Sequence, residues 1–149
     1  MTAAVPPEAF WRGVEQFNQQ EFYACHDTLE ALWMEATEPD KRFYQGILQI
    51  AVGCYHLGNF NWRGAVILLG EGIRRLGDYQ PIYEGIDVTE LLTQSVELLK
   101  ALQQTGPESV EDFVKQLALA PTTDITNSSD TAVARLPKIL RGDDESDRE

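Results

Sequence analysis

The residues best suited to chemistry are two histidines, one glutamate and two glutamines in two segments with helical periodicity. His26 and Glu30 are four residues apart in the first segment, whereas Gln45, Gln49 and His56 follow at steps of four and seven in the second. Residues at these spacings share one face of a helix. If the two helices pack antiparallel, we expect their polar faces to meet in a buried His/Glu/Gln cluster. Buried polar groups are costly unless they are hydrogen-bonded, so such a cluster would need a structural or functional reason.

Two non-catalytic interpretations account for the predicted cluster. In the first, the side chains form a structural hydrogen-bond network that fixes the register of the helices. In the second, they line a binding pocket in which Trp33, Tyr55 and Trp62 offer flanking aromatic faces. A few convergent polar groups within an apolar cleft are typical of ligand sites. The ligand would be a small molecule or a group on a protein partner.

The alternative is a metal-dependent or acid–base enzyme that uses the same residues. His26, Glu30 and His56 are the ligand types of a two-histidine, one-carboxylate metal site. Glu30 and His26 also form a plausible acid–base pair if burial raises the pKa of the carboxyl group. The sequence contains no H-E-x-x-H motif and no glycine-rich phosphate loop, so it implies no particular cofactor. We therefore rank the enzyme second, behind a non-catalytic binding or scaffold protein.

Composition limits the class of protein. The chain has 149 residues, of which 43% are hydrophobic, and a formal net charge of -12. The excess of acid argues against nucleic acid and anionic membranes as partners, because both would be repelled. We find no basic region followed by an apolar run at the N-terminus and no uninterrupted apolar stretch of membrane-spanning length. These features predict a cytoplasmic protein, and they leave its oligomeric state open.

Apolar periodicity predicts an all-α protein, an antiparallel bundle of five to six helices with no sheet. We expect one helical domain over residues 1–120 and an acidic, loosely structured tail over 121–149. Residues 77–87 are predicted to form a loop. The expected helices begin at Glu8 and then cover residues 21–36, 41–57, 62–76, 88–104 and 108–119.

A faint internal repeat supports a bundle built from helix hairpins. A shift of 40 residues superimposes Gly13, Cys25 and Trp33 on Gly53, Ala65 and Ile73. Two helix–turn–helix copies of this kind resemble tetratricopeptide-like hairpins, in which small residues let helices approach.

Two further features fall outside the polar cluster. Cys25 and Cys54 lie among apolar residues, which predicts two buried, reduced thiols, with a redox disulfide between the helices as the alternative. The segment Val133–Leu140 is an apolar island within the polar tail. We expect it to dock as an extended arm on its own bundle, and a partner protein is the other candidate.

The order of these motifs resembles a known family. The stretches EFYACHDTLEALW and RFYQGILQIAVGCYHLGNFNWRGAVILLGEGIRRL carry the pattern of the bacterial and plastid-lineage family catalogued as domain of unknown function family 309. The resemblance covers about Phe10–Leu76, and the turn at residues 59–62 is one residue longer than in the family pattern. It implies a helical bundle and no established activity. The matching residues are Phe22, His26, Glu30, Trp33, Gln45, Gly46, Gln49, Tyr55, His56, Gly58, Asn59, Gly64, Ala65 and Leu76.

Overall fold

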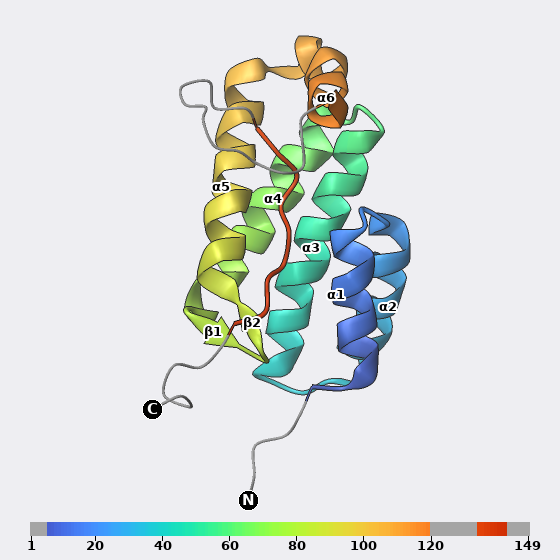
Figure 1. Cartoon of the computed structure of the whole chain (residues 1–149), viewed down its shortest axis with the longest axis vertical. Coiled ribbons are helices and arrows are strands. Elements are labelled where there is room, and N and C mark those ends of the chain that lie inside the picture. Colours follow the sequence, from blue (N-terminus) through green and yellow to red (C-terminus); the bar gives the residue numbers. More distant parts are fainter. Residues whose placement is uncertain (1–5, 120–133, 143–149) are drawn as a thin grey trace, which may run out of the picture.

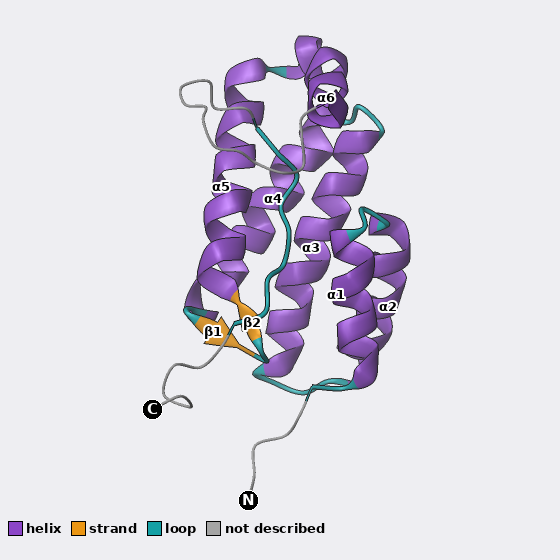
Figure 2. Ribbon diagram, in the orientation of Figure 1, coloured by secondary structure: helices purple, strands orange, loops and turns teal. Residues whose placement is uncertain are grey.

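The computed structural model describes residues 6–119 and 134–142, and within these ranges it contains six α-helices (Figures 1 and 2). The predicted helical bundle is therefore confirmed in its main elements. The helices are α1 (Glu8–Asn18), α2 (Phe22–Glu35), α3 (Asp40–Gly58), α4 (Trp62–Leu76), α5 (Val88–Thr105) and α6 (Val110–Leu119).

The longest helix, α3, is the centre of the bundle. It packs against α2 on one side and against α4 on the other, while α1 packs on α2 and α5 on α4 (Figure 1). Helix α6 lies across one end. Because successive helices contact each other, the chain is a series of helix hairpins. Their tetratricopeptide-like character stays a prediction.

Two helix starts are fixed by side-chain caps. The Oδ1 atom of Asn61 accepts a hydrogen bond from the backbone N–H of Gly64 at 2.9 Å, and the Oδ1 atom of Asp87 accepts one from Glu90 at 2.9 Å. Each cap satisfies a backbone donor that the first turn of the helix leaves unpaired. The caps explain why α4 and α5 begin where they do.

Helices α3 and α4 approach so closely that glycine is required between them. A Cβ atom on Gly72 would lie 2.6 Å from Cγ1 of Ile50 and 2.7 Å from the carbonyl oxygen of Gly46. Neither distance is compatible with ordinary packing. The glycines at this crossing therefore fix the α3–α4 distance, and through it the position of the polar face of α3.

The core is aromatic and aliphatic. The rings of Phe10, Phe17 and Phe43 are fully buried. Cys25 and Cys54 are buried free thiols, as predicted. Burial raises the pKa of the Cys25 thiol to about 12, and that of Cys54 is raised as well, so both stay protonated near neutral pH.

The prediction of a sheet-free protein is wrong over residues 77–87. A 3-10 turn at Gly77–Tyr79 leads into a hairpin in which β1 (Ile82–Tyr83) pairs antiparallel with β2 (Ile86–Asp87) (Figure 2). The turn residues Glu84 and Gly85 have φ angles of 50° and 80°. Strands of two residues are too short to show the alternation by which strands are identified in a sequence.

Residues 134–142, which we call the arm, run lengthwise along the bundle from the α6 end toward the hairpin (Figure 1). Arg141 forms an isolated antiparallel bridge with Ile86 of β2. The predicted docking of the arm on its own bundle is thus confirmed for residues 134–140, whereas Val133 and the rest of the expected tail lie outside the described residues.

No helix in the described ranges has both the length and the hydropathy to cross a bilayer.

Candidate functional site

The first part of the candidate site lies on α2. His26 is half-buried, with 26% of its side chain exposed, and Glu30 is exposed. The expected burial of the cluster is therefore wrong for Glu30. The buried face of α2 is occupied by Phe22, Cys25 and Leu29, and Glu30 follows Leu29 by about 100° around the helix, which turns it toward solvent.

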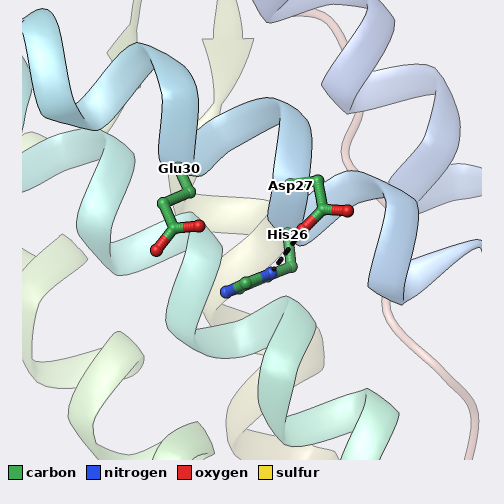
Figure 3. A group of neighbouring side chains, drawn as sticks. All are labelled: His26, Asp27 and Glu30. Atoms are coloured by element: carbon green, nitrogen blue, oxygen red, sulfur yellow. Dashed lines mark hydrogen bonds and ion pairs between the residues drawn. The ribbon is translucent and has the colours of Figure 1, made fainter.

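His26 has a neighbour that the sequence analysis missed. Its Nδ1 atom is 3.2 Å from Oδ1 of Asp27, and the Glu30 carboxylate lies on the same side of the helix as the imidazole ring (Figure 3). Each of the three residues offers one ligand atom, and these atoms lie within 4.8 Å of one another. Helical periodicity gave no signal for Asp27, because consecutive residues do not share a face.

The polar residues of α3 lie at the boundary between the core and the surface. Gln45, Gln49 and His56 are all half-buried. They are about 160° or more around the helix from Ile47, which is buried in the core. Glu30 is exposed and the polar side chains of α3 are only half-buried, so the expected buried His/Glu/Gln cluster does not form.

His56 has its own surroundings at the turn between α3 and α4. Its Nδ1 atom accepts a hydrogen bond from Nδ2 of Asn61 at 3.4 Å. A Cβ atom on Gly64 would lie 2.9 Å from Cγ of the His56 ring, so the ring packs directly on α4. His56 does not belong to the group formed by His26, Asp27 and Glu30. Gln49 has a buried Oε1 atom with no hydrogen-bond partner among the described residues.

Two tyrosines connect the histidines across the α2–α3 contact. The ring centroids of Tyr23 and Tyr55 are 5.3 Å apart, although 58% and 40% of these residues are exposed. The His26 ring lies 5.8 Å from Tyr23, and the His56 ring lies 6.2 Å from Tyr55. We call this set the tyrosine–histidine surface; it consists of Tyr23, His26, Asp27, Glu30, Tyr55 and His56.

The flanking tryptophans have structural contacts. The Nζ atom of Lys41 lies 4.3 Å from the Trp33 ring centroid and donates a hydrogen bond to the Trp33 carbonyl oxygen at 2.6 Å. Nε1 of Trp62 donates to the carbonyl oxygen of Leu102 at 2.8 Å, which ties α4 to α5. The side chain of Trp33 thus already holds a cation, whereas that of Trp62 fastens two helices together.

A second titratable cluster, also missed by the sequence analysis, joins α3 to the hairpin. The Tyr83 hydroxyl donates to Oδ1 of Asp40 at 2.6 Å, and the Glu84 carboxyl group lies beside Asp40. Burial and the neighbouring Asp40 carboxylate raise the pKa of Glu84 to about 7. The cluster joins residues more than 40 positions apart, so periodicity within one helix could not indicate it.

The structure also contains an open cavity of about 630 Å³ between α1 and the arm. Trp11, Arg12, Glu15, Ile139 and Arg141 are among the residues that line it. None of the residues of the tyrosine–histidine surface is among them. The small-molecule interpretation of the His/Glu/Gln cluster therefore has no support from this cavity.

Residues 10–68 match the family model described as "Domain of unknown function (DUF309)". This part of the chain is similar to the DUF309 family. An uncharacterized protein of Bacillus subtilis (strain 168), YpuF, is 33% identical over 72 residues. That match covers 47% of the chain described here and 41% of the length of YpuF.

The DUF309 segment extends from α1 into α4 and contains every residue of the tyrosine–histidine surface. It also contains Gln45 and Gln49. The hairpin, α5, α6 and the arm lie beyond its C-terminal end. The tyrosine–histidine surface therefore lies wholly within the matched segment, whereas the cavity beside the arm is lined by α1 and by arm residues outside that segment.

Proposed function

We propose that the chain is a non-catalytic binding module whose tyrosine–histidine surface binds a cationic segment of a partner protein. The observation that carries this proposal is the contact between Tyr23 and Tyr55, two exposed rings beside the carboxylates of Asp27 and Glu30. Tyrosine is enriched in protein interfaces because it combines a large apolar ring with a polar tip.

The chemistry of the surface favours a positively charged partner group. The face of an aromatic ring attracts a cation within about 6 Å of its centroid. Asp27 and Glu30 add negative charge next to the rings, and the net charge of -12 would steer a basic partner toward the protein. Lysine or arginine side chains on a protein segment would be attracted by the aromatic rings, by the two carboxylates and by the net negative charge.

The same pair of helices already holds one such cation. Lys41, at the start of α3, lies over the ring of Trp33 on α2. Its ammonium group also donates to a backbone carbonyl oxygen, so the cation is both stacked and hydrogen-bonded. We infer that a lysine from a partner would be held in a comparable way by Tyr23, Tyr55 and Glu30.

Fluorescence anisotropy with a labelled lysine-rich octapeptide at low ionic strength tests this proposal. Because each cation–π contact contributes about 0.5–1 kcal/mol at exposed sites, we expect the loss of two such contacts in Tyr23→Ala/Tyr55→Ala to weaken binding about five- to thirtyfold. The matched control is Ile67→Ala, which removes a comparably exposed apolar side chain from α4. Equal affinity of the double variant and the wild-type protein would refute the proposal.

A metal-dependent or acid–base enzyme is the second candidate, and the grouping of His26, Asp27 and Glu30 favours it. The hydrogen bond from Nδ1 of His26 to Asp27 would orient the ring and leave Nε2 for a ligand, as carboxylates do for metal-bound histidines. Titration calorimetry with zinc chloride tests the metal site. Stoichiometric binding that Glu30→Gln abolishes and His56→Ala retains would support it. The absence of binding heat would leave only acid–base chemistry for this candidate.

A further inference from the structure

The arm is held through its backbone by a side-chain amide. Nδ2 of Asn18 donates to the carbonyl oxygen of Ile139 at 2.9 Å, and the N–H of Ile139 donates to Oδ1 of Asn18 at 2.7 Å. One asparagine thereby satisfies both backbone groups of a single residue. Such a pair of bonds holds an extended chain without depending on the identity of its side chain.

Other elements hold the arm in the same manner. The contacts come from α5 and from the hairpin. Together with α1, these elements form the walls of the groove in which the arm lies. Each contact uses a backbone group of the arm. They are Lys138 N–H to Oε1 of Gln94 at 2.9 Å, Asp87 N–H to the carbonyl oxygen of Leu140 at 2.8 Å, and Gly142 N–H to the carbonyl oxygen of Gly85 at 3.0 Å.

The side chains of the arm give the groove its chemical preference. Pro137 and Ile139 are buried, whereas Leu140 is 46% exposed. Three of the twelve basic residues of the chain fall within residues 134–142, which contain no aspartate or glutamate. The Lys138 ammonium donates to the carbonyl oxygen of Asn18 at 2.9 Å, and the Arg141 guanidinium lies 4.0 Å from the Trp11 ring centroid.

The groove is wider than the arm that lies in it. The cavity of about 630 Å³ opens beside Ile139 and Arg141 and extends over α1 to Arg12 and Glu15. A segment of similar chemistry with larger side chains would therefore find additional contact area. An open cavity thus remains between the arm and α1.

We propose that this groove is a peptide-binding site, occupied by the protein's own arm and open to exchange with an extended, basic and apolar segment of a partner protein. The partner segment would place apolar side chains where Pro137 and Ile139 lie and a basic side chain over Trp11. The protein's own arm competes with the partner for the groove as a tethered ligand. Partner binding therefore depends on how readily the arm dissociates from the groove. This site is separate from the tyrosine–histidine surface.

The test uses the full-length protein and a labelled peptide with the sequence of residues 134–142. Ile139→Asp removes the buried apolar anchor of the own arm, so we expect this variant to bind the peptide at least tenfold more tightly than the wild-type protein. Adding Asn18→Ala to Ile139→Asp should abolish the gain. A scrambled peptide of identical composition controls for the charge that aspartate introduces and should bind weakly to every variant.

A second variant keeps the test decisive if Ile139→Asp does not fold. Lys138→Ala/Arg141→Ala weakens the arm at half-exposed and exposed positions and leaves the core unchanged. It too should bind the ordered peptide more tightly than the wild-type protein does. If folded variants, verified by circular dichroism, bind the ordered and scrambled peptides equally or bind neither, the proposal is overturned.

Discussion

The rings of Tyr23 and Tyr55 lie against each other across the contact of α2 and α3, with centroids 5.3 Å apart, and both remain exposed. This contact connects the two histidines at the surface and places carboxylates beside them. An exposed aromatic pair contributes about 0.5–1.5 kcal/mol. We therefore expect Tyr23→Ala/Tyr55→Ala to lower the free energy of unfolding by about 1 kcal/mol in urea denaturation. A loss above about 3 kcal/mol would indicate a core role and would undermine the binding interpretation.

Two glycines of α4 form a matched pair for testing the helix crossing. Gly72→Ala would place a Cβ atom against Ile50 and the backbone of Gly46, which should cost about 1–3 kcal/mol of stability. Gly70→Ala meets nothing within 4 Å and should be neutral or stabilise the helix by about 0.5–1 kcal/mol. Thermal unfolding of the two variants checks the difference, and equal melting temperatures would contradict the close approach of α3 and α4.

The Glu84–Asp40 pair predicts a pH dependence of stability. The pKa of Glu84 is raised from 4.5 to about 7, so the folded protein holds this proton more tightly than the unfolded chain does. Its contribution is fully present below about pH 4.5 and is lost as the pH rises toward 7 and beyond. Denaturation at several pH values should show that Glu84→Gln removes this decline.

The control for that experiment is Glu97→Gln, which neutralises an exposed carboxylate on α5. The relevant quantity is the difference in pH slope between each variant and the wild-type protein, because other carboxylates titrate as well. Identical slopes for Glu84→Gln and the wild-type protein would show that the carboxyl pair is not proton-linked.

Asn18 should determine how firmly the arm is docked. Asn18→Ala removes both hydrogen bonds to Ile139, and we expect it to lower stability by about 1–3 kcal/mol. Hydrogen–deuterium exchange should quicken at residues 138–142. Gln19→Ala, at the residue that directly follows α1, is the control. Protection of the arm that is unchanged in Asn18→Ala would contradict the backbone clamp.

The helices could be predicted from the sequence because their signals are local. The apolar periodicity of residues 62–76 identified α4 with the bounds that the structure shows. The hairpin was missed because each strand has two residues and its pairing depends on the turn at Glu84–Gly85. The arm was foreseen from its apolar residues, but its clamp by Asn18 depends on contacts 121 residues apart.

The candidate site could be predicted in part. Spacing placed His26 and Glu30 on one face correctly, because i and i+4 residues are neighbours on any helix. Spacing does not show which way that face points, and Glu30 is exposed because Leu29 and Cys25 take the interior. Tyr23 was not identified, since its partner Tyr55 lies on another helix.

The most direct test of the tyrosine–histidine surface is nuclear magnetic resonance of the ¹⁵N-labelled protein titrated with the lysine-rich octapeptide. We predict that the perturbed backbone amides cluster at Tyr23, His26, Glu30 and Tyr55 and saturate with a single dissociation constant. Perturbations confined to the groove around Asn18 and Ile139, or spread evenly over the acidic surface, would contradict the proposed binding site.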